Sequence, residues 1–105
     1  MLTKSAGSRP GMVAVTFELP GSIWAEHVSV TGDFNGWHPY PMRRDDAHEN
    51  WYASLELRAG ETFRFTYLVD GRPVCDCQAD GFARGNKGEM LSVVKAVMPY
   101  VMRNP

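Results

Sequence analysis

The feature that most constrains this chain is the spacing of its apolar residues, which recur at every second position in four separate segments. These segments are residues 13–19, 28–31, 51–58 and 63–70. Successive side chains of a β-strand point to opposite faces, so a period of two is typical of a strand with one buried and one solvated face. The pattern therefore predicts an all-β protein with antiparallel strands.

Turn-forming residues stand between these segments: Pro20-Gly21, Asp33 to Gly36, Ala59-Gly60 and Asp70-Gly71. Asp-Gly between two apolar runs is a strong hairpin signal, and a last strand is expected from about Met90 to Met98, ended by Pro99. Short strands separated by turns predict a two-sheet β-sandwich of seven to eight strands.

One domain is expected, because 105 residues is within the usual size of a single core. Residues 1–11 are small and polar and predict a flexible N-terminal tail, residues 12–98 the sandwich, and residues 99–105 a C-terminal tail. The apolar C-terminal stretch either packs back on the sandwich or forms a patch for a partner. The inner face is expected to hold Val13, Val15, Phe17, Val28, Val30, Trp51, Leu55, Phe63, Phe65, Tyr67 and Val93.

Composition excludes several classes of function. A net charge of −1 gives no electrostatic reason to expect nucleic acid or a membrane surface, and no apolar run approaches the roughly 20 residues that span a bilayer. The N-terminus lacks the apolar core of a secretory signal, so a cytoplasmic location is expected. Cys75 and Cys77 are too close to form a useful disulfide, and free thiols are the expectation.

No catalytic or metal-binding motif is found. The sequence contains no nucleophile elbow and no phosphate-binding loop, and its histidines are not spaced like zinc ligands. The polar run from Arg43 to Glu49 is interpreted as a solvated hairpin loop, with a metal site at its acidic residues as the minor alternative. We therefore expect no cofactor, no metal and no enzymatic activity.

The most distinctive stretch is VSVTGDFNGW, residues 28–37. Together with WYASLELRAG at 51–60 and FRFTYLVDG at 63–71, it resembles carbohydrate-binding module family 48. That family includes the glycogen-binding module of the AMP-activated protein kinase β subunit and the early-set domains that precede isoamylases and branching enzymes. The resemblance extends from about Val13 to Val94 and implies an immunoglobulin-like early-set sandwich that binds α-glucans such as glycogen, starch or maltooligosaccharides.

The resemblance also implies site residues. The aromatic residue that stacks on a glucose ring corresponds to Trp37, with a packed corner residue as the alternative interpretation. Thr66 stands where family members place a Lys, and its hydroxyl can still hydrogen-bond a sugar. Pro73 stands where family members often place a second Trp. Lys87 lies in the loop that precedes the last predicted strand, and Arg72 follows the Asp70-Gly71 turn. Both are candidates to bind sugar hydroxyls. Outside the implied site, Trp51 is expected in the core and Trp24 over the end of the sandwich.

Two functions follow. The first is a non-catalytic, weakly binding α-glucan module, acting alone or beside a separate glucan-active enzyme or other protein. The second is an early-set interaction or structural domain that has lost the sugar site. Trp37 favours the first, whereas Pro73, Lys87 and Leu91 favour the second.

Overall fold

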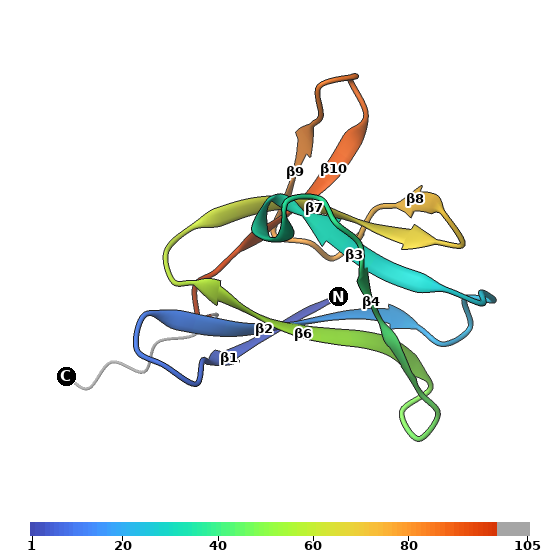
Figure 1. The fold of residues 1–105 in the computed structure, drawn as a ribbon, viewed down its shortest axis with the longest axis horizontal. Helices are drawn as coiled ribbons and strands as arrows, with labels where there is room; N and C mark the ends of the chain where they lie inside the picture. Colours follow the sequence, from blue (N-terminus) through green and yellow to red (C-terminus); the bar gives the residue numbers. More distant parts are fainter. Residues whose placement is uncertain (99–105) are drawn as a thin grey trace.

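The computed structural model describes residues 1–98, which form two antiparallel sheets packed face to face (Figure 1). The predicted all-β sandwich is confirmed. The first sheet has the order β1 (Leu2–Ala6), β2 (Met12–Pro20), β6 (Asn50–Arg58), β5 (Arg43–Asp45). The second has the order β4 (Tyr40–Pro41), β3 (Val28–Gly32), β7 (Thr62–Val69), β10 (Met90–Lys95), β9 (Gly81–Arg84), with β8 (Arg72–Val74) also paired to β7. The only helix among these residues is the short 3-10 turn η1 (Asp33–Asn35).

The core lies between the two sheets and is built from the residues that alternation placed inside. Phe17, Phe65 and Tyr67 are completely buried, and their rings pack edge to face at centroid distances of 5.1 and 5.5 Å. Trp51 is also buried, as predicted, while Phe63 is half-buried at the margin. Apolar burial and aromatic packing of this kind are the main forces that hold the sheets together.

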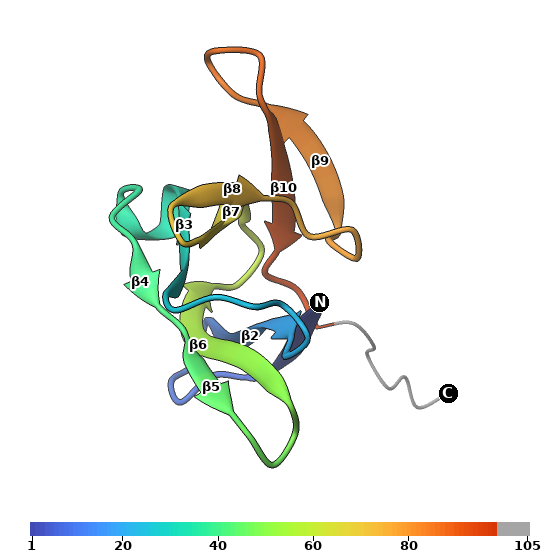
Figure 2. The same ribbon diagram turned by 90° about the vertical axis from the view of Figure 1, so that its right-hand side faces the viewer.

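The hairpin predicted at Asp70-Gly71 is confirmed. Val69 pairs with Arg72, so the loop contains two residues. Both have positive φ angles, 50° for Asp70 and 84° for Gly71, as a tight turn that follows the twist of its strands requires. Strands β9 and β10 form a second hairpin, whose tip projects away from the body of the sandwich (Figures 1 and 2).

The structure corrects several expectations. Residues 1–98 contain ten strands rather than seven or eight, because short segments interpreted as loop or tail also pair. Leu2–Ala6, assigned to the flexible tail, forms β1 and pairs along β2 from Leu2↔Phe17 to Ala6↔Val13. The strand lies at a sheet edge with one face exposed, so most of its residues are polar. Their polarity is why the sequence did not predict a strand there.

Three further corrections concern the last strand and Trp24. The last strand stops at Lys95, and Val94 rather than Val93 faces the core, because Val93 pairs with the outward-facing Arg64. Trp24 does not cover the end of the sandwich; its side chain is 94% exposed. The expected C-terminal tail, 99–105, lies outside the described residues.

A buried carboxylate ties the end of β8 to the core. Asp76 is 3% exposed; it accepts a hydrogen bond from the Tyr67 hydroxyl at 2.8 Å, and its own N–H donates to Ser92 Oγ at 2.8 Å. Burial, and then the neighbouring Asp76 charge, raise the pKa of Tyr67 well above its ordinary value. The flanking Cys75 and Cys77 are free, as expected, and exposed, so burial alternates from Cys75 through Asp76 to Cys77.

Candidate functional site

The distinctive GDFNGW segment leaves β3 and turns sharply through η1. Asn35 closes the turn from inside, because its side-chain oxygen accepts a hydrogen bond from the Gly32 N–H at 3.0 Å. The Trp37 N–H then donates to the Gly32 carbonyl at 3.0 Å. Gly36 and Trp37 both have left-handed φ angles, 64° and 62°. A bulky residue adopts this conformation only where its surroundings hold it there, and in this protein it carries the indole out to the surface.

Two residues of the segment fix it to the sandwich. The Phe34 ring packs against Phe17 at a centroid distance of 5.4 Å and against Phe63 at 6.0 Å, so it joins the core. Gly32 lies so close to β7 that a Cβ atom there would stand 2.5 Å from the Arg64 carbonyl oxygen. The absence of a side chain at residue 32 is therefore what allows the turn to rest on the sheet.

Asp33 connects the turn to the outward face of β7. Its carboxylate accepts hydrogen bonds from Arg64 Nε at 3.1 Å and from Arg64 Nη2 at 3.2 Å. The Arg64 backbone N–H donates to the same carboxylate at 2.9 Å, and the Trp37 indole N–H donates to it at 3.1 Å. A charged acceptor with four donors is a strong local anchor, and here it sets the orientation of both the guanidinium and the indole.

The electrostatics of Asp33 agree with this role. Partial burial acts to raise the pKa of its carboxyl group, but the hydrogen bonds from Arg64 and Trp37 and the charge of Arg64 outweigh it. The net result is a pKa below the ordinary value, so Asp33 is ionised at neutral pH. The same pairing raises the pKa of Arg64, chiefly through the hydrogen bond to Asp33.

Beside this anchor lies a surface hollow of about 250 Å³. Trp37 and Arg64 form one side, and the β9–β10 loop forms the other. The Trp37 side chain is 39% exposed. The residues that line the hollow are Trp37, Arg64, Gly85, Asn86, Lys87, Glu89 and Leu91. The hollow thus combines one aromatic face, a buried apolar residue and several hydrogen-bonding groups.

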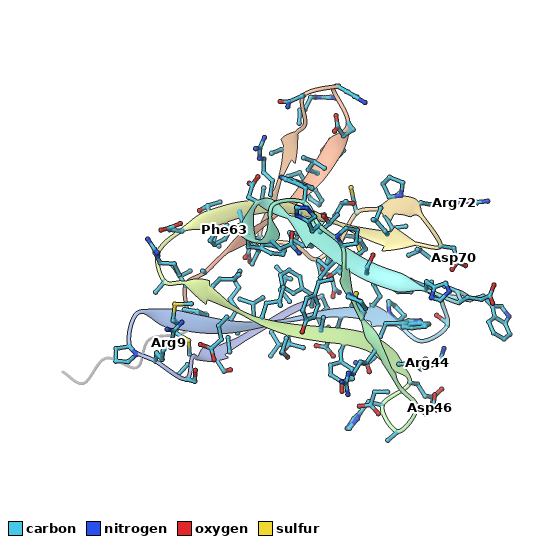
Figure 3. All side chains as sticks on the ribbon, viewed as in Figure 1. Arg9, Arg44, Asp46, Phe63, Asp70 and Arg72 are labelled. Atoms are coloured by element: carbon cyan, nitrogen blue, oxygen red, sulfur yellow. The ribbon has the colours of Figure 1, made fainter. Side chains whose placement is uncertain are left out.

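The structure brings together two of the four residues expected at the site. Trp37 and Lys87 line the hollow, but Thr66 and Arg72 do not. Thr66 is buried, and its hydroxyl donates to the Val74 carbonyl at 3.1 Å. The hollow lies near the start of β7, at Arg64, whereas Arg72 lies past the end of β7, beside Asp70 at the β7–β8 turn (Figure 3). Alternation correctly placed Thr66 on the outward face of β7. It did not predict that the Thr66 hydroxyl would donate a hydrogen bond to Val74 of β8.

Sequence reasoning did not single out Asp33 or Asn86 as site residues, and it placed Arg64 only on the outward strand face that also carries Thr66. Asp33 was interpreted as a turn former, and its carboxylate also reaches across to β7. The only available signal was that Arg64 alternates with Phe63 and Phe65 and so faces outward. A contact between residues 31 positions apart depends on the pairing of β3 with β7, which the sequence alone does not specify.

The acidic loop has a local structural role. Asp45 accepts hydrogen bonds from the N–H groups of Ala47 and His48 and from the His48 ring at 2.7 Å, which closes the β5–β6 turn. The hydrogen bond from His48 is the main cause of a lowered pKa at Asp45. Within residues 1–98 there is no group of three or more His, Cys, Asp or Glu side chains arranged to hold a metal.

A larger hollow, of about 540 Å³, lies elsewhere and includes Leu19, Ile23, Val74 and Cys77 in its lining. Its exposed lining is mostly apolar, and no aromatic residue of the described chain contributes to it. The smaller hollow offers an aromatic face and convergent polar groups, so we assign the candidate site there.

A family model matches most of the chain. The model for the glycogen recognition site of AMP-activated protein kinase matches residues 13–100. The chain belongs to this glycogen-recognition family. The match contains the GDFNGW turn, β7 and the β9–β10 loop, which together form the hollow. No curated protein matches the sequence significantly.

Solved structures share the sandwich of this glycogen-recognition family member. The ferric enterobactin esterase of Salmonella typhimurium superposes with a TM-score of 0.71 at 16% identity, over 99% of this chain and 35% of that chain. The enterobactin esterase of Shigella flexneri, crystallised with 2,3-dihydroxy-N-benzoylglycine, gives 0.71 at 16% identity, over 93% and 32%. The chain thus spans about a third of these esterases, and at such identity the likeness shows the fold alone. No helix among residues 1–98 is long and apolar enough to cross a membrane.

Proposed function

We propose that this chain is a non-catalytic α-glucan-binding module that stacks a glucose ring on the exposed face of Trp37. The observation that carries the proposal is the fixed indole: Trp37 is 39% exposed, and its indole N–H donates to Asp33 at 3.1 Å. An immobilised aromatic ring presents a flat apolar surface that complements the C–H face of a pyranose. Because the indole N–H is already bonded, Trp37 contributes its ring face rather than a donor.

Hydrogen bonds to the sugar hydroxyls come from the rest of the hollow. Lys87 supplies an ammonium group and Asn86 an amide, while Glu89 supplies a carboxylate acceptor. Arg64 donates to Asp33 through Nε and Nη2, which leaves Nη1 as the donor for a sugar hydroxyl. Such polar groups around one aromatic ring are the usual composition of a small-ligand site.

We expect weak affinity. The hollow of about 250 Å³ is smaller than the roughly 300–1,000 Å³ of typical ligand pockets. Pro73, in β8, occupies the position at which the resemblance implies a second aromatic ring, so stacking depends on one ring. A Kd of about 0.1–1 mM, equivalent to roughly 4–5.5 kcal/mol, is expected for a maltooligosaccharide. In this proposal the module works in the cytoplasm, alone or beside a separate glucan-active enzyme.

A second candidate is an early-set interaction or structural domain that no longer binds sugar. Its support is the loss of two expected polar contacts, since Thr66 is buried and occupied and Arg72 lies at the other end of β7. Under this alternative Trp37 is a surface residue held in place for a protein partner. The two candidates differ in whether the protein recognises α-glucan at all.

Affinity electrophoresis separates the two candidates and suits weak binding. The protein is run on native gels that contain glycogen, with gels containing soluble β-linked hydroxyethylcellulose as the control. Retardation by glycogen alone is the expected result. Equal mobility in all gels at glycogen concentrations equivalent to millimolar glucose chains would overturn the glucan proposal and leave the interaction domain.

A further inference from the structure

A second aromatic surface lies on a different part of the molecule. The Trp24 side chain is 94% exposed, on the loop between β2 and β3. The indole N–H groups of Trp37 and Trp51 both donate within the protein. Among residues 1–98, the Trp24 indole has no such acceptor. An exposed indole with an available N–H has both elements needed to bind a sugar ring, an apolar plate and a polar donor.

The backbone that carries Trp24 is fixed at both ends. On one side the Gly21 N–H donates to the Glu49 carbonyl at 2.7 Å. On the other, the Asp70 carboxylate accepts the N–H groups of Glu26 at 3.0 Å and His27 at 2.8 Å. Asp70 is itself part of the tight β7–β8 turn, so the hairpin and the Trp24 loop support each other. A fixed loop limits the entropy that a ligand must overcome on binding.

Two hollows beside the Trp24 indole include polar residues in their lining. One hollow, of about 440 Å³, is lined by Trp24, Val69, Asp70, Arg72 and Val74. A second, of about 250 Å³, is lined by Gly21, Ser22, Trp24 and Arg44. No ion pair or hydrogen bond among residues 1–98 occupies the Arg72 guanidinium. Arg72, which does not reach the Trp37 hollow, is therefore a candidate donor for a ligand on Trp24.

The Trp24 surface is separate from the Trp37 hollow. Arg64 lines the Trp37 hollow and Asp70 lines the larger Trp24 hollow, six positions along the same strand and its turn. At about 3.3 Å per residue, Arg64 and Asp70 are roughly 20 Å apart along the strand. Figure 3 shows Asp70 and Arg72 together at the far end of β7 and β8, with Arg44 on the neighbouring sheet.

We propose that Trp24 and Arg72 form a second, independent α-glucan contact on this module. The inference rests on the proposed function, because it takes the ligand class from the Trp37 site. A glucose ring stacks on the Trp24 indole while Arg72 and the indole N–H donate to its hydroxyls. A short oligosaccharide occupies either site separately, whereas a branched polysaccharide engages both, which raises its apparent affinity without any new contact.

The three tryptophans make a direct test possible. Each indole N–H gives its own cross-peak in a ¹H–¹⁵N spectrum of the whole chain, assigned with Trp24→Phe and Trp37→Phe. Titration with maltoheptaose is expected to shift the Trp24 and Trp37 peaks and leave that of the buried Trp51 in place. In Trp37→Ala the Trp24 response should persist with its Kd changed by less than about twofold. Arg72→Ala should weaken the Trp24 site alone, roughly three- to tenfold, with Arg9→Ala as the control.

The outcomes distinguish this inference from the proposed function. A shift of Trp37 without Trp24 would leave the proposed function standing and overturn the second contact. Loss of the Trp24 response in Trp37→Ala would show one site rather than two and would also overturn it. An equal Trp24 shift with β-linked cellohexaose would exclude α-glucan preference and favour a partner of another class. No shift at either indole would refute both proposals.

Discussion

The Asp33 carboxylate accepts the indole N–H of Trp37 at 3.1 Å while it also holds Arg64 from the neighbouring strand. One acidic side chain therefore sets both the aromatic face and a flanking cation of the hollow. The left-handed backbone at Trp37 exposes the ring, and Asp33 prevents it from rotating freely. This arrangement makes the candidate site rigid before any ligand arrives, which lowers the entropy cost of binding.

Removing the anchor should therefore weaken both the site and the fold. Asp33→Ala is expected to reduce maltooligosaccharide affinity several-fold and to lower the free energy of unfolding by about 1 kcal/mol, because partly exposed charged hydrogen bonds are screened by water. Denaturant unfolding and ligand titration measure the two effects. Asp46→Ala removes a carboxylate that is 91% exposed and should change neither quantity. Unchanged affinity in Asp33→Ala would show that the anchor has no role in binding.

The lowered pKa of Asp33 predicts a pH dependence with a definite sign. A carboxyl group with a depressed folded-state pKa contributes stability above its unfolded-state pKa, here near the ordinary 3.8, and loses it as the pH falls through the lower folded value. The difference in unfolding free energy between the wild type and Asp33→Asn should be constant from about pH 7 to 5 and shrink below about pH 4. A difference that instead grows on acidification would contradict the assignment.

The close approach of the turn to β7 predicts a sharp effect at Gly32. A Cβ atom there would lie 2.5 Å from the Arg64 carbonyl oxygen and 2.8 Å from Phe65 Cβ, so Gly32→Ala should cost about 2–3 kcal/mol of stability. Gly81→Ala is a matched control, since its nearest neighbour, Val93 Cβ, is 3.8 Å away. Thermal or urea unfolding of both variants checks the prediction, and equal stabilities would refute it.

The buried tryptophan should behave differently from the exposed ones. Trp51 is 8% exposed, and its indole N–H donates to the Ile23 carbonyl at 3.4 Å. The Arg44 guanidinium carbon lies 5.7 Å from the centroid of the Trp51 ring. Trp51→Ala is expected to destabilise the protein by roughly 3–5 kcal/mol through the cavity it leaves. Trp24→Ala should have little effect on stability because the indole makes few contacts. Urea denaturation compares the two, and a larger loss for Trp24→Ala would show that its loop is structural.

Much of the fold could be predicted from the sequence, because alternation is a local property. The apolar residues at every second position predict that Phe65 and Tyr67 point into the core. The Asp70-Gly71 pair predicts the tight turn. β1 was missed because an edge strand needs only one apolar face, and its residues are mostly polar. Burial of Thr66 depends on β8 returning against β7, which is tertiary information.

The candidate site was only partly predictable for the same reason. Trp37 was predicted from the GDFNGW motif and Lys87 from the loop before the last strand, and both line the hollow. The contact of Asp33 with Arg64 required the pairing of β3 with β7. Arg72 was expected near Trp37 because it follows the hairpin turn, but it lines a different hollow. The turn fixes the position of Arg72 along its strand, not the hollow that this end of the strand borders.

The measurement that tests the central claim most directly is a calorimetric titration of the wild type and Trp37→Ala with β-cyclodextrin, a closed α-glucan ring. We predict a Kd of about 0.1–1 mM for the wild type. In Trp37→Ala the free energy of unfolding should be close to that of the wild type, and binding at the Trp37 site should be lost. The same measurement in the Trp24→Ala background isolates that site. Equal affinity with and without the Trp37 indole in that background, or no heat of binding for the wild type at millimolar ligand, would contradict the account.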